Sequence, residues 1–510
     1  MFKRKDFVCL FVASIWALSL TGYRFGSGDH LSQFPSVLHF FDPTLYVRDF
    51  PYQMIFPPYL KVGLHIFLFS LARFLFLPVE VLYFLVFFLI LLGFFGANFL
   101  ILKWSGLKTP EIELSLYFLP LFAIFYPSIS HFSVLGDILV PYQFVLPFLL
   151  LAIYLFLRQR FIGASLLVSF SFLVHQQLGL IVFISLFLTL FLSSFLKNEK
   201  DIKAWLSFFG PFFIVFCFYF LILQFLGSHK SYPWFDPYWG QELLEMVRFR
   251  VSHHLLLSYT NLKEKLSFMI LVILVLWGLF SHRENPSFIL GLIGINFLVL
   301  MFLGWLFSEV YPLPVVLNLY LFRSDVLLRL VAFYLALILM KFKKIFILNL
   351  LSLKGLRFFL IFLSIPFFFL GPHLRFSFPA RNPIFQIGRC IQAQTPKESL
   401  ILASPAIKGL RLYSKRSVVA SFKSHGLFFS PDIAREWFRR MKILCDLPPD
   451  FSCLGKECLE LCKKNFSHFS SHKILELGAL FEVDYILVSN EMTLDLPKIC
   501  EVKGLILYSF

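Results

Sequence analysis

Apolar runs of roughly 20 residues recur through most of this chain. A helix needs about 20 apolar residues to cross the hydrocarbon core of a bilayer, where the backbone must satisfy its own hydrogen bonds. The 510 residues are 58% hydrophobic and 15% charged, which is more apolar surface than a soluble core of this size covers. The sequence therefore predicts a mainly α, multi-pass membrane protein.

Counting runs of this length gives about eleven predicted spans. They cover residues 7–23, 81–102, 111–128, 138–157, 161–176, 178–196, 206–227, 266–281, 287–308, 318–340 and 349–371. A further apolar segment, 62–77, is shorter and contains His65 and Arg73. We predict that this segment is a helix lying in or on the membrane interface, because a short apolar helix with charged residues suits that position. The alternative is a full span, which would invert the orientation of every later loop.

Charge sets the predicted orientation. Lys and Arg gather in the amino-terminal residues and in alternate short turns, at 103–113, 158–160, 197–203, 281–286 and 341–344. The positive-inside rule places these turns and the amino terminus in the cytoplasm. The formal net charge of +16 therefore reflects membrane topology, and we do not predict nucleic-acid binding. The same rule places the loop 24–80, the turn 131–137, the loop 228–265 and everything after residue 371 outside.

The predicted division is a transmembrane domain, 1–371, and a small exported α/β domain, 372–510. Helix-like segments at 382–394 and 431–441 alternate there with strand-like segments at 399–404, 417–422 and 483–489. Six of the eight cysteines lie in this tail: Cys390, Cys445, Cys453, Cys458, Cys462 and Cys500. In an exported domain these cysteines favour disulfides over a metal site, with free thiols as a further alternative.

Polar residues in the outer segments are the candidate functional groups. Asp29 follows Gly26-Ser27-Gly28, whose small residues allow the backbone to approach a ligand closely. Asp137 lies in the next outer turn. Two carboxylates at one membrane edge can act as a base or hold a divalent cation against a phosphate. His30 and Arg48 are of the residue types that pair with phosphate, whereas Asp42 fits a turn-starting role and Asp49 stays unassigned.

The layout resembles the GT-C superfamily of membrane glycosyltransferases, which includes protein mannosyltransferases, aminoarabinose transferases and oligosaccharyltransferase catalytic subunits. The resemblance is in an aspartate after the first helix, the outer loop "GDHLSQFPSVLHFFDPTLYVRDF", the segment "NLYLFRSDVLLRL" and the tail segment "IQAQTPKESLILASPAIKGLRLYSKRSVVASFK". The tail segment is similar to the start of the exported domain of oligosaccharyltransferases, but their W-W-D-Y-G motif is absent. Uncharacterised bacterial polytopic proteins of GT-C type resemble the chain more closely.

This resemblance implies transfer of a sugar from a polyprenyl-phosphate-linked donor to an acceptor at the outer face of a bacterial inner membrane. Asp29 would be the base or a metal ligand, with Asp137 assisting it. Arg323 would bind the carrier phosphate, or would pair with Asp325 or reach the interface. His175 would contact substrate or belong to a polar helix turn. The alternatives are a non-catalytic membrane protein and a transporter or flippase for lipid-linked saccharides in envelope polysaccharide assembly.

Overall fold

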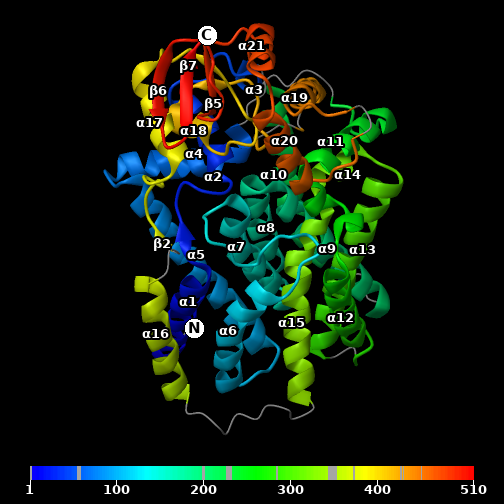
Figure 1. Ribbon diagram of the computed structural model, residues 1–510. Helices are drawn as coiled ribbons and strands as arrows, with labels where there is room; N and C mark the ends of the chain where they lie inside the picture. The colour runs from blue at the N-terminus through cyan, green and yellow to red at the C-terminus, as the bar shows by residue number, and fades with distance from the viewer. Residues whose placement is uncertain are drawn as a thin grey trace.

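The computed structural model separates long helices at one end of the molecule from a mixed α/β region at the other (Figure 1). It describes residues 3–53, 59–197, 201–225, 232–282, 285–342, 353–370, 374–424, 428, 430–448 and 451–510. The amino-terminal helix lies among the long helices, and the carboxyl terminus lies in the α/β region (Figure 1).

Each predicted span corresponds to one helix. These are α1 (Arg4–Thr21), α5 (Val79–Trp104), α6 (Thr109–Phe125), α7 (Pro141–Leu157), α8 (Phe161–Val174), α9 (Gln176–Lys197), α10 (Ile202–Phe225), α12 (Leu262–Leu279), α13 (Pro286–Trp305), α15 (Ser324–Phe342) and α16 (Leu353–Leu370). Among the described residues, α5, α9, α10 and the α13 region are long and apolar enough to cross a membrane by themselves. The chain is thus a multi-helix membrane protein, and the count of eleven spans stays a prediction.

Polar contacts group the turns at two ends of the helices. At one end, the Lys341 ammonium donates to the Gly106 carbonyl at 2.6 Å and Arg357 pairs with Glu113. At the other end, Arg24 pairs with Asp137. The sequence predicts that Lys341, Gly106 and Glu113 lie in cytoplasmic turns and that Arg24 and Asp137 lie in outer ones, so the contacts between turns join residues predicted to share a side. Arg357 lies within the predicted span 349–371.

The first outer loop forms three helices: α2 (His30–Phe41), α3 (Phe50–Gln53) and α4 (Tyr59–Phe74). Helix α4 corresponds to the predicted interfacial segment. Its 16 residues span about 24 Å at 1.5 Å per residue, less than the roughly 30 Å hydrocarbon core. It lies beside α2 near the α/β region (Figure 1), and His65 on it bonds to the Tyr83 hydroxyl at 2.8 Å.

Further helices follow two of the later predicted spans. The loop before α12 contains α11 (Pro237–Leu255) and the 3-10 turn η1 (Leu257–Tyr259). Helix α13 continues into a π-helical turn, η2 (Leu306–Val310), and α14 (Pro314–Leu319) and η3 (Leu321–Arg323) precede α15. The predicted span at 318–340 therefore begins as a helix only at Ser324, because Tyr320 has a left-handed backbone that ends α14.

The tail contains a five-stranded sheet in the order β4-β3-β5-β7-β6. Its strands are β3 (Leu400–Ala403), β4 (Ser417–Val418), β5 (Tyr485–Ser489), β6 (Lys498–Val502) and β7 (Leu505–Ser509). The two pairs made by β3 are parallel, and β7 is antiparallel to both β5 and β6. Its helices are α17 (Pro383–Gln394), α18 (Leu410–Ser414), α19 (Pro431–Leu444), α20 (Lys456–Ser467) and α21 (Ser471–Leu480).

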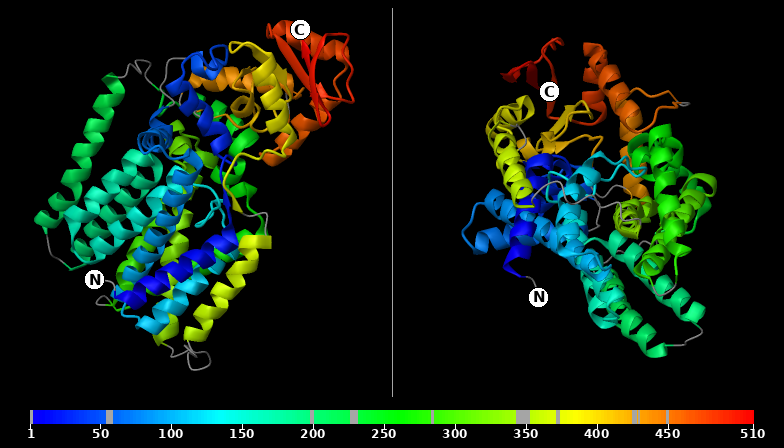
Figure 2. Two further views of the ribbon diagram at one scale, coloured as in Figure 1. Left: turned by 90° about the vertical axis from the view of Figure 1, so that its left-hand side faces the viewer. Right: turned by 90° about the horizontal axis from the view of Figure 1, so that it is seen from below.

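The tail is not packed as a separate body. Strand β1 (Tyr23–Arg24) of the first outer loop pairs in parallel with β2 (Leu374–Arg375) at the start of the tail. One hydrophobic cluster contains Trp239 of α11, Phe50 of the first loop and Trp437 of the tail. Two perpendicular views show the blue first-loop helices beside the yellow-to-red tail (Figure 2).

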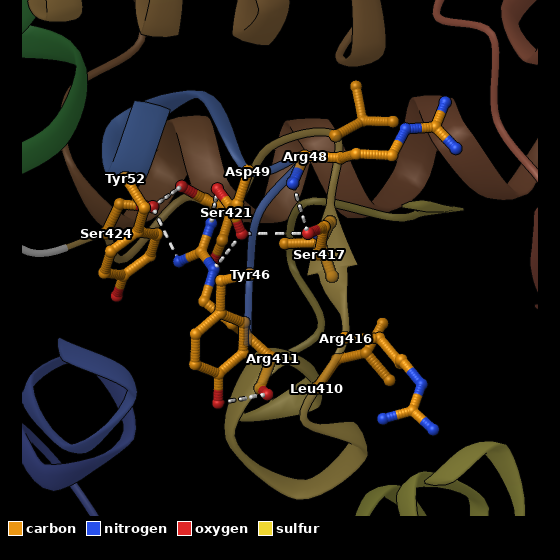
Figure 3. Close-up of polar contacts among 12 residues, drawn as sticks. Tyr46, Arg48, Asp49, Tyr52, Leu410, Arg411, Arg416, Ser417, Ser421 and Ser424 are labelled. Atoms are coloured by element: carbon orange, nitrogen blue, oxygen red, sulfur yellow. Dashed lines mark hydrogen bonds and ion pairs between the residues drawn. The ribbon is translucent and has the colours of Figure 1, made fainter. Parts of the chain in front are cut away.

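A buried ion pair fixes this packing. Asp49 of the first loop accepts two hydrogen bonds from the Arg411 guanidinium, at 2.6 and 3.0 Å, and a third from the Val418 amide at 3.3 Å. The Asp49 and Arg411 side chains are 0% and 6% exposed. Nearby, the Tyr46 hydroxyl donates to the Arg411 carbonyl (Figure 3). The first loop and the tail therefore share one polar core.

All six tail cysteines are paired. The bonds join Cys390 to Cys500, Cys445 to Cys462, and Cys453 to Cys458. The first connects α17 with β6, and the other two join the end of α19 and the following segment to α20. Cys9 and Cys217, in predicted spans, are free.

We expect Asp49→Asn to destabilise the packing of the first loop on the tail. Removing one charge of a buried pair leaves the other uncompensated, at a cost of about 3–5 kcal/mol. The purified chain should melt at a lower temperature and be cut faster by protease in the tail. Asp42→Asn is the matched control, because Asp42 makes an exposed pair with Lys397 and should change little. Equal melting temperatures of Asp49→Asn and Asp42→Asn would contradict a stabilising role for the buried Asp49–Arg411 pair.

If the tail is exported, it folds in a compartment where disulfides persist. Non-reducing peptide mapping should then recover the three pairs above, and a membrane-impermeant maleimide should label the tail of intact cells only after reduction. Labelling that requires permeabilised cells would instead place the tail in the cytoplasm and reverse the orientation.

Candidate functional site

A cavity, named the larger cavity here, lies between the turns at the α/β end of the helices, α11 and the tail. Its volume is about 420 Å³. The first loop contributes Asp29, the turn before α9 contributes His175, and the turn before α15 contributes Arg323. The tail contributes Lys423 and Lys456. Segments nearly 400 residues apart thus meet here, and three of the predicted site residues border one cavity.

Two glycines place Asp29 at this position. Gly26 and Gly28 have φ angles of 65° and 56°, a region that favours glycine. A Cβ at Gly26 would lie 2.4 Å from the ring of Phe378, and one at Gly28 would lie 2.7 Å from Ile138. The small residues therefore serve a tight turn against protein neighbours, and α2 begins directly after Asp29.

Arg323 is held by rings and neutral polar groups. Its guanidinium lies 4.6 Å from the centroid of Phe132 and 4.7 Å from that of Tyr320. One terminal nitrogen is 2.9 Å from His175 Nε2 and also bonds to the Gln177 amide oxygen. The ion pair that Asp325 makes is with Arg329, at 3.3 Å. Arg323 thus keeps its positive charge available to the cavity.

Lys423 forms an ion pair with Asp29, with Nζ 2.5 Å from Oδ1. Its loop is held by Arg250 of α11, which donates to the carbonyls of Phe422 and Ser424 at 3.0 and 2.5 Å. Neither Lys423 nor Arg250 was predicted from the sequence to be a site residue. "SFKSHG" carries no recognisable motif, and only the packing of the tail on α11 brings Lys423 to Asp29.

The cavity wall has an excess of positive charge. Five cationic side chains and one carboxylate border it: Arg250, Arg323, Lys408, Lys423, Lys456 and Asp29. Three polar atoms on lining residues are buried and have no hydrogen-bond partner within the described parts of the chain, namely Arg323 Nε, His253 Nδ1 and Gln176 Nε2. Such atoms are costly unless a ligand or water bonds to them. The arrangement suits an anionic ligand rich in acceptor oxygens, such as phosphate.

Electrostatics set the protonation states in the cavity. Burial alone would raise the pKa of Asp29, but the charge and hydrogen bond of Lys423, with smaller contributions from His254 and Arg323, lower it to about 2. Burial lowers the pKa of His253 to about 4, helped by the charges of neighbouring residues. At neutral pH Asp29 is ionised and His253 is neutral. Asp29 is therefore a weak base as long as Lys423 pairs with it.

His30 lies behind the cavity wall. Its side chain is fully buried, Nδ1 accepts from the Gly26 amide at 3.2 Å and Nε2 donates to the Leu139 carbonyl at 2.8 Å. The ring stacks on Phe34 with 4.4 Å between centroids. These contacts use both ring nitrogens, so His30 fixes the loop that carries Asp29.

Arg48 and Asp137 each form an ion pair away from the larger cavity. Arg48 Nη1 lies 2.6 Å from Asp484 Oδ2 in the tail, which joins the first loop to the sheet. Asp137 pairs with Arg24 and accepts the Arg24 amide through its own carbonyl. Neither residue borders the cavity. Asp29 is thus the one carboxylate that the described chain brings to this cavity.

The residues described do not form a metal site. Groups of three or more His, Cys, Asp or Glu placed to hold an ion are absent from them, and Asp29 and Asp137 have separate cationic partners. Since the donor set does not fit a divalent cation, we assign no step to one.

We expect Lys423→Met to raise the pKa of Asp29, because burial would then act without its main opposing charge. A carbodiimide reacts with protonated carboxyl groups. At pH 4 to 5, peptide mass spectrometry should find Asp29 more extensively modified in Lys423→Met than in the wild type. Lys408→Met is the control, because it leaves the Asp29–Lys423 pair in place. Equal modification in all three proteins would refute control of Asp29 by Lys423.

Comparison with known proteins gives two findings. A model of the family described as Domain of unknown function (DUF6798) matches residues 384–444, which extend from α17 to α19. Among solved structures, the archaeal oligosaccharyltransferase AglB from Archaeoglobus fulgidus, in complex with an inhibitory peptide and a dolichol-phosphate, is similar over 94% of this chain and 69% of that chain. The TM-score is 0.48 and the sequence identity 12%. No curated protein matches the chain.

Proposed function

We propose that this chain is an integral membrane glycosyltransferase that binds a polyprenyl-phosphate-linked sugar in the larger cavity. It passes the sugar to an acceptor hydroxyl at the outer face of a bacterial inner membrane. The observation that supports the proposal is the cationic cavity at the α/β end of the helices, in whose wall Arg323 Nε has no hydrogen-bond partner among the described residues. The phosphate of a membrane lipid lies near the ends of the membrane-spanning helices, which is where this cavity is found.

The residues suggest a division of roles. Arg323 donates hydrogen bonds to the phosphate oxygens, and the flanking rings of Phe132 and Tyr320 keep its guanidinium in position. Lys423 and Lys456 add positive charge where the phosphate leaves. Asp29 takes the proton from the acceptor hydroxyl once Lys423 has moved away from it.

The proposed sugar transfer needs no reactant other than the donor and the acceptor. The acceptor oxygen forms a new bond to the anomeric carbon as that carbon's bond to the phosphate oxygen breaks. The electron pair leaves with the phosphate, whose charge the cationic side chains stabilise. The acceptor proton goes to Asp29 and then to solvent.

One observation favours a second candidate, a protein that binds or moves lipid-linked saccharides without transferring the sugar. Asp29 is held as an ion pair by Lys423, and in that state the cavity has a site for phosphate but only a weak base. Binding and transfer must therefore be measured separately.

Binding is tested with undecaprenyl phosphate and the full chain in nanodiscs, by native mass spectrometry. Arg323→Gln should weaken binding about 10- to 100-fold, because a hydrogen bond to a charged group contributes roughly 1.5–3 kcal/mol. Arg435→Gln is the control, since Arg435 makes an exposed pair with Glu242. Unchanged binding in Arg323→Gln would contradict the proposal that Arg323 binds the lipid phosphate.

Transfer is tested with lipid-linked sugar extracted from the native membrane. Asp29→Asn should keep undecaprenyl phosphate binding and reduce transfer by about 100-fold or more, the scale expected for loss of a positioned base. Transfer at the wild-type rate would refute the role of Asp29 as base. Binding without transfer in the wild type, together with movement of the lipid between leaflets, would support the second candidate instead.

A further inference from the structure

A second cavity of about 270 Å³ lies between the first outer loop and the tail sheet. Gly28 and Leu31 of the first loop form one wall. The tail forms the other, with Ser404 and Ser421 among the lining residues. Nothing in the proposed donor site uses this space.

The sheet topology places this cavity where open α/β sheets bind ligands. Strand β3 lies between β4 and β5 and is parallel to both. The chain leaves β3 for β4 on one side and later returns to β5 on the other, so the strand order reverses at β3. Ligands of open α/β sheets bind outside the carboxyl ends of the strands. The cavity lies at this edge of the sheet: Ala403 ends β3 and Ser404 follows it, and Val418 ends β4, with Ala420 and Ser421 after it.

The lining is cationic. Among the described residues, the side chains that border the cavity include four basic ones, Arg24, Lys408, Arg411 and Lys423, and no acidic one. Arg24, Arg411 and Lys423 each form an ion pair, with Asp137, Asp49 and Asp29, so Lys408 provides the charge that is not paired. Arg411 is a fixed part of the wall, because its guanidinium is bound to Asp49 (Figure 3). Lys408 makes no ion pair within the described residues, and the Ser404 hydroxyl is buried without a hydrogen-bond partner there. A small anion would satisfy both groups.

The two cavities meet at the Asp29–Lys423 pair. Lys408 and Lys423 border both cavities. Asp29 borders the larger one, and its neighbour Gly28 borders the smaller one. An anion in the second cavity would therefore attract the ammonium that covers the Asp29 carboxylate.

We propose that the second cavity binds an anionic group of the acceptor, a phosphate or a carboxylate, and that this group draws Lys423 away from Asp29. The base is then uncovered when acceptor is present, which limits loss of donor to water. The coupling to Asp29 rests on the proposed function, whereas anion binding in the second cavity does not.

A cysteine reporter tests the site without an activity assay. The full chain carries Ser404→Cys, with Cys9 and Cys217 replaced by alanine, and reacts with anionic and cationic methanethiosulfonates of similar size. The anionic reagent should react about 10-fold faster at position 404. Ser471→Cys, on the exposed start of α21, gives the reference ratio, and Lys408→Gln should lower the preference at position 404. Ser421→Cys is the second reporter should Ser404→Cys fail to fold.

Competing anions then identify the acceptor chemistry. Inorganic phosphate that slows modification at position 404 indicates a phosphorylated acceptor, and glucuronate that slows it indicates a uronic acid. The protection should persist in Arg323→Gln, because Arg323 borders only the larger cavity. Equal reagent rates without protection would overturn the second site, and so would protection that disappears in Arg323→Gln. These reaction rates do not depend on lipid binding or sugar transfer. A failure of the proposed donor site would therefore appear in the undecaprenyl phosphate binding and transfer assays and not in this experiment.

Discussion

The buried ion pair between Asp49 and Arg411 is the contact on which both cavities depend. It joins the first outer loop to the tail, and removing either charge would leave the other without compensation in a desolvated site. The parallel pairing of β1 with β2 and the Arg48–Asp484 bridge act between the same two parts. Because Asp29 comes from the loop and Lys423 from the tail, this packing determines whether they meet. The tail therefore helps to build the site and is not an appendage to a helical domain.

In the larger cavity, the positive charge of Arg323 is held in a fixed position. Arg323 lies between two aromatic rings and is bonded to neutral partners, so its charge is positioned yet not cancelled. Asp29 is instead neutralised by Lys423. An anionic acceptor group beside Lys423 would compete with Asp29 for this lysine, so the basicity of the Asp29 carboxylate would depend on whether acceptor is bound.

The sequence predicted the helices well because apolar runs of spanning length have few alternative folds. It also identified Asp29, His175 and Arg323, which were predicted to share a side and which meet at one cavity. Asp137, His30 and Arg48 have the same residue types, but their partners Arg24, Leu139 and Asp484 use their polar atoms. Lys423 and Arg250 escaped notice, as did the role of Asp49, because their meaning comes from contacts between distant segments. Strands β6 and β7 were missed for the same reason, since pairing with β5 defines them.

The central claim is that the larger cavity holds a lipid-linked phosphate. A cryo-electron microscopy structure of the full chain in nanodiscs saturated with undecaprenyl phosphate tests it most directly. We predict phosphate density in the larger cavity against Arg323 Nε. Lipid phosphate bound at another surface, with the larger cavity empty, would contradict this claim.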